Sequence, residues 1–208
     1  DGLIMDSFSV STAIGKIFTE NKIKTINVAT SVSGHSVIVK KITVTAPTAE
    51  EVASAVPYEA QQYIPFDMAD VNLSYEVLGP APVGTGFDVM LVAVKRDKIL
   101  NHTNVLSQTG KTAAVVDIDA FALQNAYEFN YEPAENQTVA LLNIGASVMN
   151  INIVRGRVPL FTRYVSVGGM QYTDSLQKEL DLSFEDAERV KMGRSVPGVS
   201  DEARLPVL

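Results

Sequence analysis

The residues best suited to chemistry lie in a run of short strands and glycine turns spanning residues 143–169. An apolar segment, residues 139–142, leads into a turn of small residues, Gly145-Ala146-Ser147, and the later pair Gly168-Gly169 begins a helical pattern. A turn without bulky side chains lets backbone N–H groups approach a ligand, and successive N–H groups favour phosphate. The first N–H groups of a helix also favour an anion. If the two glycine elements converge in space, we expect a phosphate clamp.

Other candidate catalytic side chains favour structural interpretations. Asp117 and Asp119 stand two residues apart, a spacing that superficially suits an acid/base or metal pair, but Asp119 occupies the expected cap of a helix over residues 119–127. His35 and His102 have no Asp, Glu or Cys beside them at ligand spacing, so we expect both at the surface or in loops.

Two blocks of elements must position these residues. The first follows the order strand–strand–helix–strand–strand–helix over residues 25–110, which is typical of a compact α+β unit. Its expected elements are strands 25–31 and 36–45, helix 48–63, a hairpin of 71–78 with 88–94, and helix 97–107. A slip in the alternation of the second strand predicts a bulge, and Pro57 predicts a kink or break in its helix. Strand 111–116 and helix 119–127 follow this block. The second block consists of the three short strands of the glycine run, followed by helix 170–180 and by a short helix over 183–192 that Ser183 caps with Asp186.

Composition limits the class of function. The net charge is −7, the pI is near 4.8, and 46% of the 208 residues are hydrophobic. An acidic chain argues against general nucleic-acid binding, and no apolar run approaches the roughly 20 residues of a membrane-spanning helix. Cysteine is absent from the sequence, which excludes disulfides and thiolate metal sites. Because the chain starts at Asp1 without Met and its last residues, 204–208, resemble the start of another element, we interpret it as a piece of a larger protein.

Several segments resemble one known family. They are residues 58–66 (YEAQQYIPF), 71–77 (VNLSYEV), 143–154 (NIGASVMNINIV), 158–163 (VPLFTR), the Gly168-Gly169 pair and 184–191 (FEDAERVK). Together they resemble the PilM family of actin-like type IV pilus assembly proteins over nearly the whole chain. The resemblance implies an α/β chain with part of an actin/FtsA-like ATPase fold. Residues 25–110 would be an FtsA-like inserted α+β subdomain, 1–24 and 111–135 part of the first actin-like subdomain, and 136–208 part of the second, with its phosphate-binding hairpin.

The resemblance also assigns roles to the glycine run. Gly145, Ala146 and Ser147 would form the second phosphate-binding loop, and Gly168 and Gly169 would lie against the nucleotide. In the following helix Glu188 and Lys191 would reach the ribose and base, because a carboxylate and an ammonium suit a hydroxyl and a ring nitrogen. Asn150 is a weaker candidate at the base of the loop.

Departures from the family pattern favour binding over hydrolysis. No first phosphate loop of Asp-x-Gly type is recognisable near the start, and the chain ends before the later adenosine loop is due. Asn143 occupies the position where hydrolytic actin-like proteins carry an Asp that helps to hold magnesium or the attacking water. An amide neither accepts that proton nor supplies the negative charge. We therefore expect ATP, with Mg, to be bound with weak or no hydrolysis, and binding by this chain alone stays open.

The implied function is a cytoplasmic nucleotide-binding adaptor, held at the inner membrane by capturing the N-terminal cytoplasmic peptide of the membrane protein PilN. By family likeness the peptide lies in a groove between the inserted subdomain and its neighbour, and Ile64, Pro65 and Phe66 are candidate contacts. The alternative is that these three side chains belong to the core. Other pilus-platform proteins are further expected partners, and homo-oligomerisation stays open.

Two rival functions remain. One is an active actin-fold ATPase or phosphotransferase that uses Asp117 or Asp119 as its base. The other is an FtsA-like protein in which ATP drives filament formation.

Overall fold

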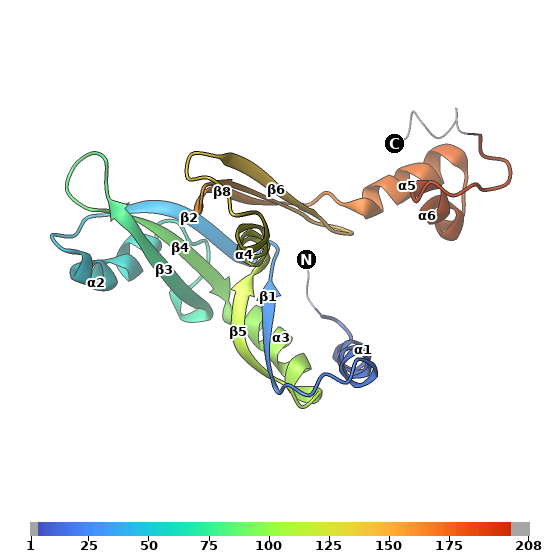
Figure 1. Cartoon of the computed structure of the whole chain (residues 1–208), viewed down its shortest axis with the longest axis horizontal. Coiled ribbons are helices and arrows are strands. Elements are labelled where there is room, and N and C mark those ends of the chain that lie inside the picture. The colour runs from blue at the N-terminus through green and yellow to red at the C-terminus, as the bar shows by residue number, and fades with distance from the viewer. Residues whose placement is uncertain (1–3, 201–208) are drawn as a thin grey trace. The chain divides into compact units, whose positions relative to one another are not determined.

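The computed structural model describes residues 4–200 (Figure 1). The chain divides into two compact units. Unit 1 comprises Asp1–Leu141 and Asn152–Arg163, and unit 2 comprises Leu142–Ile151 and Tyr164–Leu208. The glycine turn and the last two helices thus belong to one unit. The assignment of the chain to three actin-like subdomains stays a prediction.

Unit 1 contains a three-stranded antiparallel sheet in the order β2-β4-β3, built from β2 (Val37–Val44), β4 (Phe87–Lys95) and β3 (Val71–Pro80). Helix α2 (Ala49–Ala60) packs on one face of it, and the short 3-10 helix η1 (Met68–Asp70) leads into β3. Side chains alternate across a strand, so one face of central β4 presents Val89, Leu91 and Ala93 to the core shared with α2. The opposite face of β4 carries the side chains of Met90, Val92 and Val94.

The sequence anticipated this sheet with two errors. The predicted β3–β4 hairpin is confirmed. The predicted bulge in β2 is wrong, because β2 pairs with β4 in unbroken register, and the register shift lies in β3 between Val77 and Gly79. Helix α2 contains Pro57 without ending there, since it continues to Ala60 and stops three residues before the predicted end at Tyr63.

A second, parallel pair of strands lies in the same unit. β1 (Asn27–Val32) pairs in parallel with β5 (Thr112–Ile118), so the strands of residues 25–110 lie in two sheets. Helix α3 (Arg96–Gln108) precedes β5 and helix α4 (Asp119–Tyr131) follows it. Helix α1 (Ser7–Glu20) is capped by Asp6, whose carboxylate accepts a hydrogen bond of 3.0 Å from the N–H of Ser9.

The predicted three-strand run forms a sheet in the order β6-β7-β8, made of β6 (Thr138–Ile144), β7 (Met149–Arg155) and β8 (Val158–Val165). Its second turn requires glycine on two counts. Gly156 has φ +55°, and a Cβ there would lie 2.8 Å from the carbonyl oxygen of Glu135. Asn152, fully buried in β7, donates to Gln124 of α4 at 3.1 Å and so ties the sheet to that helix.

Unit 2 ends in two packed helices, α5 (Gly169–Leu180) and α6 (Phe184–Lys191). Their shared core contains Leu176, Ala187, Val190 and Val196. The predicted cap of α6 is confirmed, because the Ser183 hydroxyl accepts from the N–H of Asp186 at 3.1 Å. No helix within residues 4–200 is long and apolar enough to cross a membrane.

Candidate functional site

The two glycine elements converge, as the sequence led us to expect. The N–H of Gly169 donates to the carbonyl oxygen of Gly145 at 2.9 Å, and the N–H of Met170 donates to that of Ala146 at 2.7 Å. The N–H of Gly168 is also engaged, because it donates to the side-chain oxygen of Gln171 at 2.7 Å. The start of α5 therefore binds the turn itself, and the expectation that its first N–H groups are free for an anion is wrong.

This arrangement decides where a phosphate could bind. The peptide bonds of the turn are trans, so each N–H points away from the carbonyl of its own peptide unit. Because the carbonyls of Gly145 and Ala146 point to α5, the N–H groups of Ala146 and Ser147 point away from it. Within residues 4–200 neither N–H has a hydrogen-bond acceptor, and both residues are exposed. The turn thus offers two adjacent donors, the pattern of an anion-binding nest.

Gly168 is required by the closeness of the turn rather than by its backbone angles, since its φ of −164° is ordinary extended backbone. A Cβ on Gly168 would lie 2.5 Å from the carbonyl oxygen of Gly145 and 2.6 Å from the carbonyl group of Ala146. Gly145 is crowded too, because a Cβ there would lie 2.9 Å from the carbonyl oxygen of Val148. Small residues let the two backbones touch.

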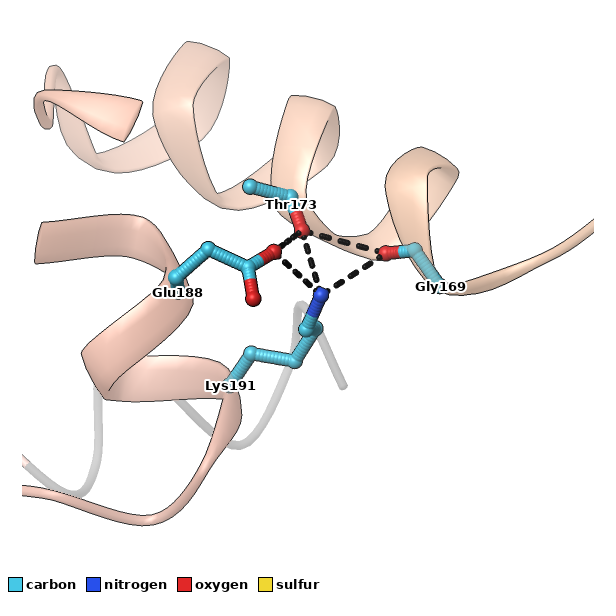
Figure 2. A network of polar contacts seen from close by, with 4 residues as sticks. All are labelled: Gly169, Thr173, Glu188 and Lys191. Carbon is cyan, nitrogen blue, oxygen red and sulfur yellow. Dashed lines mark hydrogen bonds and ion pairs between the residues drawn. The ribbon is translucent and has the colours of Figure 1, made fainter. Parts of the chain in front are cut away.

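Glu188 and Lys191 of α6 meet α5 at this same corner (Figure 2). The Lys191 ammonium donates to the Thr173 hydroxyl at 2.7 Å and to the carbonyl oxygen of Gly169 at 3.3 Å. It also forms a close ion pair with Oε1 of Glu188, which accepts a further short hydrogen bond from Thr173. The side chains of Glu188 and Lys191 are each 25% exposed, whereas Thr173 is fully buried.

The surroundings of Glu188 keep its carboxylate ionised. The hydrogen bond from Lys191 and then the one from Thr173 lower the pKa of Glu188 below its ordinary value of 4.5, and they outweigh the opposing effect of burial. An ionised carboxylate can only accept hydrogen bonds. This side chain is therefore suited to a ligand that offers hydroxyl or amino groups.

The sequence did not point to Thr173, and it indicated Asn150 as a weaker candidate at the base of the loop. Thr173 lies four residues after Gly169, so helical periodicity places it on the face that carries the glycine contact, and this signal could have found it. Asn150 is 3% exposed in β7, which suits support of the turn from inside rather than contact with a ligand at the surface. Asn143 is exposed near the end of β6, two residues before Gly145.

A second candidate site lies in unit 1, on the face of the β3–β4 hairpin opposite the core. It is a groove of about 500 Å³. Its floor consists of three cross-strand pairs, Asn72 with Val94, Ser74 with Val92, and Glu76 with Met90. Its walls include Ile99 of α3, Val116 and Asp117 of β5, and Phe121 of α4. The lining is mainly apolar, with two carboxylates.

The proposed partner-binding segment lies elsewhere. Ile64 is 6% exposed and belongs to the core under the β2-β4-β3 sheet, which agrees with the alternative interpretation that it is a core residue. Phe66 is half-buried against the same core with the Lys95 ammonium 4.4 Å from its ring centre, and Pro65 is exposed. None of the three lines the groove.

Asp117 and Asp119 both have local structural roles at the junction of β5 and α4. Asp117 accepts from the N–H of Ile118 at 2.8 Å. The cap prediction for Asp119 is wrong by one position: Ile118 is the cap and Asp119 is the first helical residue. At this position the negative charge of Asp119 interacts favourably with the helix dipole. Burial lowers the pKa of Lys98, and the charge of Asp119 opposes that effect.

The two histidines differ. His35 is exposed, as expected. His102 is half-buried in α3 with Nδ1 3.1 Å from the carbonyl oxygen of Lys98, and burial lowers its pKa, so its placement at the surface was wrong. No group of three or more His, Cys, Asp or Glu side chains suited to a metal occurs within residues 4–200.

Comparisons with known proteins identify the family. The family model for the type IV pilus assembly protein PilM matches residues 1–205. The solved PilM-PilN type IV pilus biogenesis complex is similar with a TM-score of 0.83 and 26% identity, covering 99% of this chain. The present chain spans 61% of that matched chain.

More distant structures share the fold alone. MreB5 of Spiroplasma citri bound to ADP has a TM-score of 0.50 at 15% identity, over 92% of this chain and 42% of that one. The ethanolamine utilization protein EutJ from Carboxydothermus hydrogenoformans has a TM-score of 0.54 at 13% identity, over 100% of this chain and 52% of that one. The chain therefore belongs to the PilM family of type IV pilus assembly proteins and has part of the actin-like ATPase fold.

Proposed function

We propose that this chain is part of a nucleotide-binding adaptor that captures the N-terminal peptide of PilN at the base of the type IV pilus machine. It would act in the cytoplasm, peripheral to the inner membrane through PilN. The observation that carries the proposal is the groove on the free face of the β3–β4 hairpin, in a family with a solved PilM-PilN complex.

The groove suits an extended peptide. Met90, Val92 and Val94 form a row of apolar side chains along β4, and apolar pockets along a strand take alternate side chains of a bound peptide. Glu76 and Asp117 add negative charge to the lining, which favours a peptide with basic as well as apolar residues.

The glycine corner suits a nucleotide. The N–H groups of Ala146 and Ser147 would hold a phosphate on the side of the turn that faces away from α5. Glu188 would accept a hydrogen bond from a ribose hydroxyl or the base. ATP bound here would fix one conformation of the adaptor. Mg would then be held mainly by the phosphates and water, because Asn143 offers no charge to it.

Binding of the peptide is tested by calorimetry with a PilN N-terminal peptide and the full-length protein. Val92→Asp introduces a charge into the groove and should weaken peptide affinity at least tenfold. Val83→Asp is the matched control, because Val83 is 86% exposed in the loop between β3 and β4. Circular dichroism and ATP affinity report whether each variant is folded. Equal peptide affinity for both variants, or no peptide binding by the wild type, would overturn the adaptor proposal.

Binding of nucleotide is tested by titration with ATP in the presence and absence of Mg. We expect saturable binding with slow or no phosphate release. Rapid release that collapses in Asp119→Asn would favour the enzyme, and ATP-dependent light scattering would favour the filament-former.

A further inference from the structure

Thr173 lies at the centre of the polar corner, although its side chain is fully buried (Figure 2). Its hydroxyl accepts from Lys191 at 2.7 Å and donates to Oε1 of Glu188, with the carbonyl oxygen of Gly169 3.1 Å away as a second acceptor. We propose that Thr173 is the positioning residue of this site, and that it orients Glu188 to accept a hydrogen bond from the ribose diol of a nucleotide. This inference rests on the proposed nucleotide function.

The donors and acceptors at the corner allow one consistent assignment. An ammonium has three protons, and Lys191 has three acceptors around it: Gly169 O, Thr173 Oγ1 and Glu188 Oε1. The hydroxyl of Thr173 has one proton, and the carboxylate of Glu188 is a stronger acceptor than a backbone carbonyl because it is charged. Thr173 therefore donates to Glu188 and accepts from Lys191.

This assignment separates the roles of the ion pair. The donors of Lys191 are all used inside the protein, so Lys191 anchors the first turn of α5 and neutralises Glu188 instead of binding a ligand. Both contacts of Glu188 fall on Oε1, and within residues 4–200 its Oε2 has no partner. The free oxygen of a partly exposed carboxylate is left for a ligand. Of the two ligand contacts that the family resemblance implies, from Glu188 and from Lys191, this assignment leaves one, with Oε2 of Glu188 as the acceptor.

Gly169 connects this polar network to the turn that would hold the phosphate. Lys191 holds the carbonyl oxygen of Gly169, and the N–H of the same residue holds the carbonyl of Gly145 in the turn. The orientation of Glu188 and the position of the turn therefore share one residue. Loss of the Thr173 hydroxyl should alter recognition of the nucleoside more than recognition of phosphate, since the turn keeps its own bonds to α5.

The test compares Thr173→Val, which keeps the shape but removes the hydroxyl, with Thr173→Ser, which keeps the hydroxyl. Thr173→Ala removes the hydroxyl without adding bulk, so agreement between the Val and Ala variants isolates the hydroxyl from packing. Affinities for ATP, 2′,3′-dideoxy-ATP and inorganic tripolyphosphate are measured on the full-length protein. Carbon-13 NMR titration of Glu188 reports its protonation without any ligand.

We expect the Val and Ala variants to bind ATP about tenfold more weakly, the effect of one charge-assisted hydrogen bond. The Ser variant should match the wild type within about twofold, and tripolyphosphate affinity should be unchanged in all of them. Dideoxy-ATP should bind the wild type more weakly than ATP and should be insensitive to residue 173. The Glu188 titration should move to higher pH in the Val and Ala variants.

Three outcomes would overturn the inference while the proposed function stands: wild-type ATP affinity in the Val and Ala variants, an equal loss in the Ser variant, or an equal loss for tripolyphosphate. A wild-type protein that binds neither ATP nor tripolyphosphate would overturn the proposed function, and the role of Thr173 in it as well.

Discussion

The β2-β4-β3 sheet and the glycine corner are stabilised in different ways. The sheet is stabilised by an apolar core in which Val44, Val52, Val56, Val89 and Leu91 are all fully buried. The glycine corner has few large side chains, and backbone contacts and one polar network hold it together. In a packed core, a smaller side chain lowers stability in proportion to the volume lost. A corner built on backbone contact does not tolerate an added methyl group, because backbone atoms cannot rotate away.

The first prediction, with the largest expected effect, is a loss of stability when the core of the β2-β4-β3 sheet is truncated. Leu91→Ala removes a fully buried side chain from the core under α2 and should lower the free energy of unfolding by about 3 kcal/mol. Leu100→Ala, at a position 57% exposed in α3, is the control and should cost less than about 1 kcal/mol. Urea unfolding followed by circular dichroism measures both. A loss of equal size at the two positions would mean that this sheet does not depend on its core.

The second prediction adds a methyl group to the glycine corner. Gly168→Ala should lower the free energy of unfolding by about 2 kcal/mol, because the new Cβ meets backbone atoms of the turn. Gly15→Ala adds the same group in α1, where nothing lies within 4 Å, and should stabilise the protein by up to about 1 kcal/mol. Thermal unfolding of both variants gives the comparison. Gly168→Ala with unchanged stability and ATP affinity would show that the two backbones do not touch.

The third prediction concerns the helix that carries Glu188. Ser183→Ala removes the cap of α6 and should cost about 1 kcal/mol. Ser54→Ala in α2, where the exposed hydroxyl donates to the carbonyl oxygen of Glu51, is the control and should change stability by less than about 0.5 kcal/mol. A Ser183→Ala protein as stable as the control would indicate that α6 is held by its core alone.

The smallest predicted effect is a dependence on pH. The pKa of Glu188 is lower in the folded protein than its ordinary value of 4.5, so its share of the stability is complete above that pH and is lost as pH falls through the folded pKa. Glu188→Gln should remove this component, so its stability should fall less steeply than that of the wild type below about pH 4.5. Chemical denaturation at a series of acidic pH values measures the difference. Parallel curves for the two proteins would mean that Lys191 and Thr173 do not favour the ionised form.

Prediction from sequence succeeded where the pattern is local. The hairpin of β3 and β4, the cap at Ser183 and the strand–turn–strand run before Gly168-Gly169 follow from alternation and turn chemistry within a few residues. It made no prediction where a partner is distant in sequence. The partner of β1 is β5, about 85 residues away, and nothing in the alternation of β1 distinguishes β5 from its neighbour β2.

The sequence by itself determined the types of groups at the site: a turn of small residues, a Gly-Gly start to a helix, and a carboxylate and an ammonium one turn apart in α6. Only the tertiary structure decided how they are used. It turned the carbonyls of the glycine turn toward α5, placed Thr173 between Glu188 and Lys191, and put Ile64 into the core rather than the groove. The physical reason is that local patterns specify which hydrogen-bonding groups are present. Which donor meets which acceptor depends on how elements far apart in the chain pack together.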